Sequence, residues 1–374
     1  MTKEIEELLT RGVIEVIDKD HLQKRLESGE KLRIKLGIDP TSPNIHIGRA
    51  TQLLKLRDFQ QLGHTAVFIV GDFTGMIGDT SDKDSERPML SREQVQANMQ
   101  TYFDQAFKIL DKNKTETHYN SEWLAKLGYA DIDKMAYLFS VHEFAAREVI
   151  ARRLETGQRV SMVEMMYPLM QGYDSVAVKA DVELGGTDQR YNLLAGRKIQ
   201  PIYNQEPQDI MTVELLEGTD GRKMSASWGN VINITGESND MFGKVMSVAD
   251  NLVKKYFDLC TRVPTDEISE ILILHPKEAK MRLAYEITKI YHGEDKAKEA
   301  EDSFELTFSK GGVPENIKIV TAHPDEPLGE ILLREGIVSS KTEFNRLMKA
   351  GAIEEKENGI YRIGKHRFLK IERK

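Results

Sequence analysis

Two polar segments of the 374-residue chain combine residue types that bind and move phosphate groups. The first, Gly37 to Ala50, reads GIDPTSPNIHIGRA, and its proline-rich turn leads into a predicted helix near His46. The start of a helix attracts anions through its free N–H groups and its dipole. Gly48 allows a base or phosphate to approach the backbone, and the imidazole of His46 can hydrogen-bond to a phosphate oxygen. Considered alone, such a segment is more often a simple helix cap.

The second segment, Asp220 to Asn230, reads DGRKMSASWGN. Lys223, followed by Ser225 and Ser227, is typical of a flexible loop that carries a cation to a leaving group. An ordinary surface turn has a similar composition, and alone this segment favours that simpler interpretation. Neither segment suggests a nucleophile triad, so the chemistry they indicate is the positioning of phosphate groups.

Both segments follow strands of a predicted α/β domain. Apolar runs predict strands at Leu32–Ile38, His64–Val70, Ala180–Gly186 and Asp209–Leu215, with a helix over about 46–62 between the first two. Strand, helix and strand at this spacing indicate a right-handed parallel unit. A mostly helical block lies between the second and third strands, over about 91–177.

The domain organisation follows from these patterns. We predict a catalytic α/β domain over 1–222 with a helical insertion at about 91–177, then a helical domain over 223–308 that begins with the polar loop. A linker rich in glycine and proline is expected over 309–326, and a small module over 327–374. That module carries a local charge of +4 on a chain of net charge -8. A basic module on an acidic body indicates contact with RNA, although a solvated charged surface gives the same balance.

Composition excludes several other classes of protein. No apolar run approaches the roughly 18 residues that a membrane helix needs, and the charged N-terminus shows no secretory signal. Cys260 is the only cysteine, which excludes an internal disulfide and any multi-cysteine metal site. We therefore expect a cytoplasmic protein in a reducing compartment.

Together, the H-I-G and K-M-S sequences resemble the two signatures of class I aminoacyl-tRNA synthetases. Phe68–Ser81, Met165–Ser175 and Val182–Arg197 resemble the tyrosyl-tRNA synthetase family, in the bacterial branch whose first motif reads K-x-G-x-D-P. Val338–Ile353 is similar to the S4-type RNA-binding helix pair that ends that branch. The resemblance implies a Rossmann-like parallel sheet with a helical insertion, a helical anticodon-side domain and an S4-like α+β domain. It also implies an ATP-dependent ligase, a homodimer, that joins L-tyrosine to tRNA(Tyr).

The resemblance assigns roles toward ATP. The catalytic residues would be His46, Thr41, Lys223 and Ser225; the other ATP contacts would be Asp39, Gly48, Arg49, Lys83, Arg87, Gly186 and Asp188. His46 and Thr41 would contact the phosphates, and Lys223 would reach the pyrophosphate. Gly186 and Asp188 would hold the ribose, and Asp39 would lie near the ribose or the substrate ammonium. Mg²⁺ would accompany ATP, and neither a protein-held metal nor a tightly bound cofactor is expected.

The resemblance also implies a pocket for tyrosine, formed by Asp79, Tyr167, Gln171, Asp174 and Gln189. Tyr167, Gln171 and Asp174 are spaced i, i+4 and i+7, which places them on one helix face. Asp79, Tyr167 and Gln171 would hold the ammonium group, and Asp174 would accept the phenol hydrogen. Such an acceptor discriminates against phenylalanine, which leaves it unpaired. In the terminal module, Lys341, Arg346 and Lys349 would bind RNA.

Three positions depart from the family pattern. Arg49 stands where a second histidine or an asparagine is usual, Ala226 where a lysine is usual, and Lys35 where the better-known branch has a tyrosine that touches the phenol. Arg49, Lys83 or Arg87 would supply the missing cation contact, and the second partner of the substrate hydroxyl stays open. Two alternatives also stay open: a related protein with weak or redirected adenylation, and a non-catalytic RNA-binding protein on the same frame.

Overall fold

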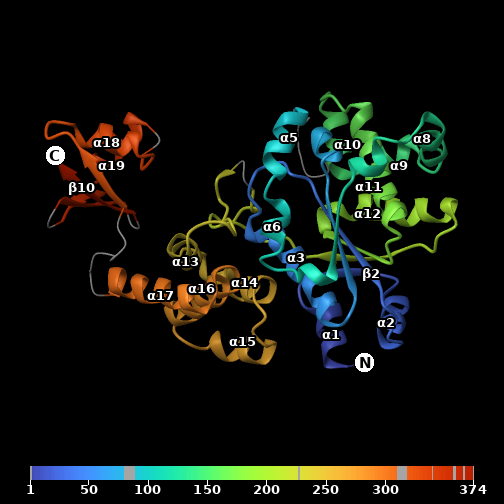
Figure 1. Cartoon of the computed structure of the whole chain (residues 1–374), viewed down its shortest axis with the longest axis horizontal. Coiled ribbons are helices and arrows are strands. Elements are labelled where there is room, and N and C mark those ends of the chain that lie inside the picture. The colour runs from blue at the N-terminus through green and yellow to red at the C-terminus, as the bar shows by residue number, and fades with distance from the viewer. Residues whose placement is uncertain are drawn as a thin grey trace.

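A six-stranded sheet forms the centre of the larger part of the chain (Figure 1). The computed structural model describes residues 2–79, 89–225, 228–309, 318–338, 340–356, 359–364 and 367–373. The strands are β1 (Val13–Ile17), β2 (Arg33–Ile38), β3 (Thr65–Val70), β4 (Thr115–Tyr119), β5 (Val182–Gly186) and β6 (Asp209–Val213). Their order is β1-β6-β5-β2-β3-β4, and neighbouring strands run parallel except β1, which is antiparallel to β6.

Helices cover both faces of this sheet. The helices of this part are α1 (Lys3–Thr10), α2 (Lys19–Glu27), α3 (Ile47–Gln61), α4 (Thr74–Ile77), α5 (Arg92–Met99), α6 (Tyr102–Ala106), α7 (Ser121–Leu124), α8 (Tyr129–Ala136), α9 (Val141–Ala145), α10 (Glu148–Glu155), α11 (Met162–Val178) and α12 (Arg190–Ile199). Short 3-10 turns are η1 (Lys112–Lys114), η2 (Thr187–Gln189) and η3 (Gln200–Tyr203).

The two faces of the sheet belong to different cores because successive side chains of a strand point to opposite sides. In β3, Phe68 and Val70 join the large core that includes α3, whereas Val67 and Ile69 pack with Val178 of α11. All four of these β3 side chains are buried. Burial on both faces explains why β3 reads as a continuous apolar run in the sequence.

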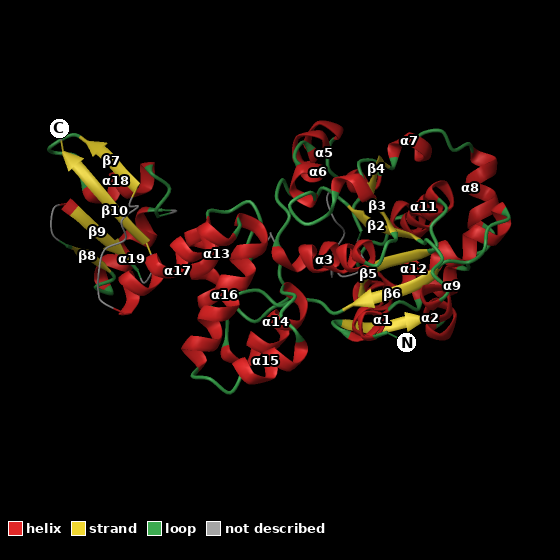
Figure 2. Ribbon diagram, turned by 60° about the horizontal axis from the view of Figure 1, so that its bottom comes forward, coloured by secondary structure: helices red, strands yellow, loops and turns green. Residues whose placement is uncertain are grey.

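Two further parts follow the sheet domain (Figure 2). The helical part contains α13 (Ser238–Met246), η5 (Asp250–Leu252), α14 (Val253–Cys260), α15 (Thr265–Ile271), α16 (Pro276–His292) and α17 (Glu294–Ser309). The terminal part contains β7 (Lys318–Ala322), α18 (Leu328–Arg334), α19 (Lys341–Lys349), β8 (Ile353–Glu355), β9 (Ile360–Ile363) and β10 (Arg367–Arg373), with the sheet order β7-β10-β9-β8. It has its own apolar core, built from Ile331, Leu332, Ile363, Leu369 and their neighbours.

The predicted strands and the parallel unit are confirmed, but two predicted segments contain strands that were not expected. The linker over 309–326 contains β7, which pairs with β10 and belongs to the terminal sheet. The helical block over 91–177 contains β4, which pairs in parallel with β3, so the insertion is interrupted by a strand of the main sheet. Both strands are short and mix polar with apolar residues, so neither stands out as an apolar run. Among the described residues, no helix is long and apolar enough to cross a membrane.

Candidate active site

A cavity of about 610 Å³ opens at the carboxyl ends of β2, β3 and β5. Most of the predicted site residues line it: Asp39, Thr41, His46, Gly48, Arg49, Asp79, Tyr167, Gln171, Asp174, Asp188, Gln189, Lys223 and Ser225. Gly186 does not line it, and the neighbouring Gly185 does. The predicted contacts Lys83 and Arg87, and the departure at Ala226, lie outside the described residues. Ligands commonly bind at this edge of a parallel sheet.

Asp174 on α11 forms one polar end of the cavity. Its Oδ1 accepts a hydrogen bond from Trp123 Nε1 at 2.7 Å, and its Oδ2 accepts one from Asn120 Nδ2 at 3.3 Å. Burial raises the pKa of Asp174 to about 7, against the opposing effect of the Lys35 ammonium and of these two donors. A buried carboxylate held at both oxygens is an oriented acceptor for a hydroxyl group.

A second polar group is centred on Asp39, directly after β2. The Tyr167 hydroxyl donates to Asp39 Oδ2 at 2.8 Å, and Thr74 Oγ1 donates to Asp39 Oδ1 at 2.7 Å. Burial raises the pKa of Asp39 to about 6. Gln189 Nε2 donates to Asp79 nearby. These residues place two carboxylates and a phenol on the side of the cavity where a substrate ammonium could be held.

His46 caps the start of α3, as the sequence predicts, and stays neutral. Its Nδ1 accepts the Arg49 backbone N–H at 3.3 Å. Burial, together with the positive charges of Arg49 and Lys223, lowers the pKa of His46 to about 3. The neutral ring therefore carries its proton on Nε2, which can donate to a phosphate oxygen. A methyl group on Gly48 would lie 3.1 Å from the His46 ring and 3.2 Å from Met224 Sδ, so glycine keeps this corner open.

Two cations face the same end of the cavity. The Arg49 guanidinium donates to the backbone oxygen of Asp39 at 3.0 Å and to Thr41 Oγ1 at 2.9 Å, so it lies across the turn that follows β2. Lys223 Nζ donates to Asp188 Oδ2 at 2.8 Å. The loop that carries Lys223 is fastened by Asn230, whose amide contacts Asp220 and whose oxygen accepts the Ser225 backbone N–H.

Asn120, Trp123 and Thr74 also belong to the site and were not predicted from the sequence. Asn120 and Trp123 immediately follow β4, and Thr74 begins α4 after β3. Recognition of β4 as a parallel strand would have placed the residues after it at the same edge as those after β2 and β3. Lys35 does not line the cavity, and its Nζ is bonded to the Gln171 backbone oxygen and to Ser175 Oγ.

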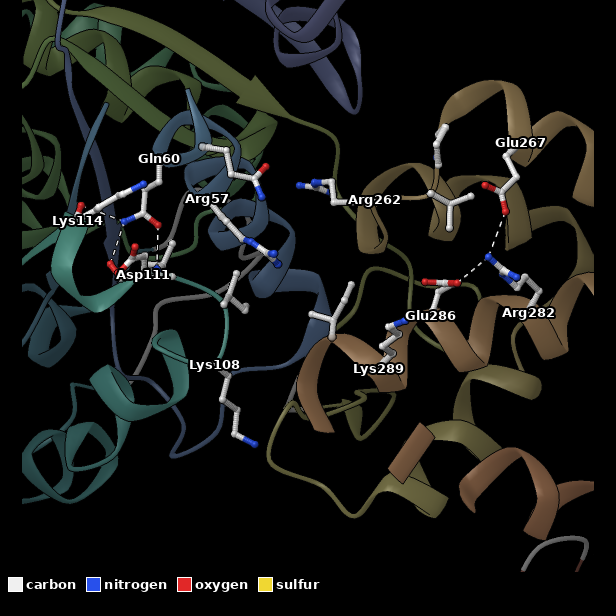
Figure 3. A pocket seen from close by; sticks show the side chains of 16 residues that line it. Arg57, Gln60, Lys108, Asp111, Lys114, Arg262, Glu267, Arg282, Glu286 and Lys289 are labelled. Carbon is white, nitrogen blue, oxygen red and sulfur yellow. Dashed lines mark hydrogen bonds and ion pairs between the residues drawn. The ribbon is translucent and has the colours of Figure 1, made fainter. Parts of the chain in front are cut away.

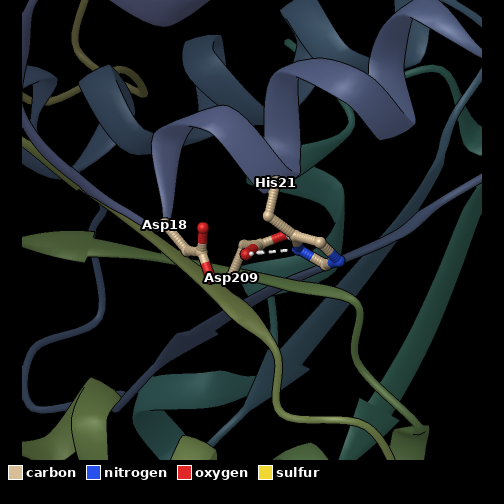
Figure 4. Close-up of side chains that lie close together, drawn as sticks. All are labelled: Asp18, His21 and Asp209. Atoms are coloured by element: carbon tan, nitrogen blue, oxygen red, sulfur yellow. Dashed lines mark hydrogen bonds and ion pairs between the residues drawn. The ribbon is translucent and has the colours of Figure 1, made fainter.

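Two other groups of polar residues lie at the opposite edge of the sheet. A cleft of about 770 Å³ lies between the end of α3 and α16. Figure 3 shows its lining side chains, among which Arg282 bridges Glu267 and Glu286. Figure 4 shows Asp18, His21 and Asp209, whose ligand atoms lie within 4.8 Å of one another and form a candidate metal cluster. Because Arg197 already contacts both of these carboxylates, we interpret the cluster as an ion network.

Comparison with known proteins decides the family. Residues 27–309 match the model of the family described as tRNA synthetases class I (W and Y). A protein of Nitratidesulfovibrio vulgaris named Tyrosine--tRNA ligase is 46% identical, over 98% of this chain and 97% of its own length. A protein of Thermotoga maritima with the same name is 42% identical, over 97% and 96%. The chain belongs to the tyrosyl-tRNA synthetase family.

Solved structures of tyrosyl-tRNA synthetases share the fold of this family member. The mitochondrial enzyme of Aspergillus nidulans has a TM-score of 0.70 at 22% identity and covers 82% of this chain and 95% of its own. The enzyme of Archaeoglobus fulgidus, solved with L-tyrosine, has a TM-score of 0.64 at 22% identity and covers 80% and 100%. The predicted fold class, a Rossmann-like sheet with a helical domain and a small terminal sheet domain, is confirmed.

The raised pKa of Asp174 predicts a pH dependence of tyrosine binding. The ionised carboxylate is a stronger acceptor for a hydroxyl group than the protonated carboxyl group, and this carboxylate gains a proton as the pH falls through about 7. We expect the KM for tyrosine to be constant above the pKa, to rise about 10-fold as the pH falls through it, and to level off where Asp174 is fully protonated.

The KM is measured by tyrosine-dependent pyrophosphate exchange across the pH range, with phenylalanine as the comparison. Protonation of Asp39, whose pKa is about 6, affects both amino acids alike. The ratio of the two KM values therefore isolates Asp174. A ratio that does not change with pH would contradict the prediction.

Proposed function

We propose that the chain is a tyrosine–tRNA ligase. The carboxylate of L-tyrosine attacks the α-phosphate of ATP, which forms tyrosyl-adenylate and releases pyrophosphate. The terminal ribose hydroxyl of tRNA(Tyr) then takes the tyrosyl group and releases AMP. Asp174 supports this proposal most strongly, since it is a buried acceptor oriented by two donors in the cavity that also holds His46 and Lys223.

The residues divide into two groups along the cavity. Asp174 accepts the phenol hydrogen, while Asp79, Tyr167 and Gln171 hold the ammonium group. At the other end, His46 Nε2 and Thr41 contact phosphate oxygens. These groups act by positioning the carboxylate and by stabilising charge on the phosphates, so no protein nucleophile is required.

ATP is expected to bring Mg²⁺ with it. Within the described part of the chain, the cluster of three residues that could hold a metal ion is Asp18, His21 and Asp209, away from the cavity. The cation would therefore be held mainly by phosphate oxygens and water, as is usual for Mg²⁺ on a nucleotide. Lys223 and Arg49 add fixed positive charge at the same end.

Pyrophosphate exchange into ATP, measured with each amino acid in turn, tests the proposal. Exchange with tyrosine alone, followed by charging of tRNA(Tyr), is the expected result. Tyrosine exchange without charging would favour redirected adenylation. RNA binding without exchange with any amino acid would favour a non-catalytic protein on the same frame.

We further propose that α19 in the terminal module contacts the tRNA. Lys341, Arg346 and Lys349 are exposed on this helix, while Phe344 and Leu347 pack into the core of the module. Changing the three cations to alanine is expected to raise the KM for tRNA about 10-fold. The slope of log KM for tRNA against the logarithm of the salt concentration should fall by about two to three. Each cation that neutralises a phosphate adds about one to that slope.

Aminoacylation at several salt concentrations checks this prediction, with pyrophosphate exchange as the internal control. Exchange takes place without tRNA and should keep the wild-type rate. An unchanged KM for tRNA would exclude α19 as a contact. The matched control changes Lys3, Lys19 and Lys31, which are exposed in the sheet domain.

A cytoplasmic homodimer is the state that we propose for the protein. Large apolar side chains are exposed on the insertion, including Tyr137 at 91%, Val141 at 69% and Met162 at 72%. Exposed apolar surface of this kind is typical of an interface with another chain. Sedimentation or light scattering tests the dimer by asking whether the mass in solution is twice the 42.6 kDa of the chain.

A further inference from the structure

A buried ion pair lies directly behind the cavity. Lys35 on β2 and Glu183 on β5 are register partners in neighbouring parallel strands, and their charged atoms are 2.9 Å apart. Lys35 is 0% exposed and Glu183 is 1% exposed. Both side chains point to the α11 side of the sheet, at positions that are usually apolar in a strand buried on both faces.

The pair is bonded to the residues that line the cavity. Lys35 Nζ donates to the backbone oxygen of Gln171 at 2.7 Å and to Ser175 Oγ at 2.8 Å. Gln171 Nε2 donates to Glu183 Oε1 at 3.1 Å, and Ser175 Oγ donates to Glu183 Oε2 at 3.1 Å. The pair therefore holds α11 on both sides of Asp174.

Stability alone gives little reason for such a pair. Taking two charges out of water is costly, and replacing a buried ion pair with apolar residues is often neutral or stabilising. A role in the site accounts for its hydrogen bonds to Gln171 and for its position beside Asp174. We propose that Lys35 and Glu183 are positioning residues that fix Gln171 and Asp174 as acceptors for the two ends of the substrate tyrosine.

Glu183 acts on Gln171. A side-chain amide has a donor end and an acceptor end, and a carboxylate can bind only the donor end. Because Gln171 donates to Glu183 through Nε2, its oxygen is left for the cavity. An ammonium group needs such an acceptor. Without Glu183 the amide could turn and present its NH₂ group to the ammonium instead.

Lys35 acts on Asp174. Its ammonium is a fixed positive charge near this buried carboxylate and favours the ionised form, which accepts the phenol hydrogen. The groups that face Asp174 are Lys35 from β2, Glu183 from β5, Asn120 and Trp123 after β4, and Tyr167 from α11. Among these described neighbours, Lys35 is the cation.

The test uses the full-length double variant Lys35→Met with Glu183→Gln. The single change Lys35→Met would leave Glu183 as an uncompensated buried charge and could prevent folding. Lys55→Met is the matched control, because Lys55 is also a buried lysine, 4% exposed. Its Nζ donates to the Leu8 backbone oxygen at a distance of 3.0 Å, and neither residue lines the cavity. Pyrophosphate exchange is measured with tyrosine and with phenylalanine, per active site as titrated by adenylate formation.

We expect the double variant to have a KM for tyrosine about 10- to 100-fold higher, as for the loss of a hydrogen bond to a charged group. The tyrosine-to-phenylalanine ratio of kcat/KM should fall about 10-fold, and the KM for ATP should stay within about two-fold. The Lys55→Met control should keep all three values.

The inference rests on the proposed function, and the outcomes separate the two. Absence of tyrosine exchange in the wild-type protein would remove the proposed function and this inference with it. An active wild type with an unchanged tyrosine KM and ratio in the double variant would overturn only the inference. Equal losses for tyrosine and phenylalanine would overturn the action of Lys35 on Asp174, since the ammonium group that Gln171 holds is common to both amino acids and only the hydroxyl group distinguishes them.

Discussion

Replacing Lys223 with alanine is expected to slow tyrosyl-adenylate formation about 100- to 1000-fold, the effect of removing one preorganised charge from a transition state. Lys223 lines the end of the cavity that we propose for the phosphates, and its Nζ donates to Asp188 Oδ2 at 2.8 Å. Because the proposed tyrosine site is at the other end, the dissociation constant for tyrosine should change less than about two-fold. Single-turnover adenylate formation and equilibrium binding of tyrosine measure the two quantities separately.

The neighbouring Arg222 offers a matched control for Lys223. It is a cation in the same loop, but it pairs with Asp220 and lies over the Trp228 ring, and it does not line the cavity. Arg222→Ala should therefore keep a near wild-type rate. If both variants lose the same factor, the effect comes from disturbance of the loop, and the assignment of Lys223 to the leaving group is wrong.

Replacing Asp174 with alanine is expected to lower kcat/KM for tyrosine about 100-fold. The change removes the acceptor of the phenol hydrogen and leaves two buried donors, on Trp123 and Asn120, without their partner. Phenylalanine has no hydroxyl group, so its kcat/KM should fall much less. Pyrophosphate exchange with both amino acids gives the tyrosine-to-phenylalanine ratio of kcat/KM. This ratio should fall toward the value expected for two substrates that the pocket distinguishes only by shape.

Asp209→Ala is the control for Asp174→Ala. Asp209 is also a buried aspartate, 0% exposed and bonded to His21, but it lies at the opposite edge of the sheet. Its loss should lower the thermal stability of the protein and keep the tyrosine-to-phenylalanine ratio. A similar fall of that ratio in both variants would mean that Asp174 has no specific role in recognition.

The central strands could be predicted from the sequence because both of their faces are buried. β3 reads as an apolar run, β2 alternates apolar residues with Arg33 and Lys35, and each is followed by a turn. β4, with the sequence TETHY, lies at the edge of the sheet and has no fully buried residue. β7 follows a segment rich in glycine and proline, and only Val320 and Ala322 of its residues are buried. A short strand with one buried face gives a weak signal among helices and turns.

The part of the site that lies on one helix could be predicted from the sequence, because the helical repeat alone determines which residues share a face. Tyr167, Gln171 and Asp174 share a face of α11 because of the helical repeat, and all three line the cavity. The donors to Asp174 were not predictable, since they depend on where β4 ends. The pairing of Lys35 with Glu183 depends on the register of two strands that are distant in sequence, which no local pattern specifies.

β7 lies upstream of the module predicted over 327–374, and it determines where a terminal fragment must begin in order to fold by itself. β7 runs parallel to β10 over Lys318–Ala322, and it contributes Val320 and Ala322 to the core of the module. A fragment cut at residue 327 would leave the backbone amides and carbonyls along one side of β10 without a neighbouring strand. An unpaired strand edge of this kind can pair with strands of other molecules, which leads to aggregation. The smallest self-contained unit therefore starts upstream of Lys318, within what the sequence alone presents as a connector.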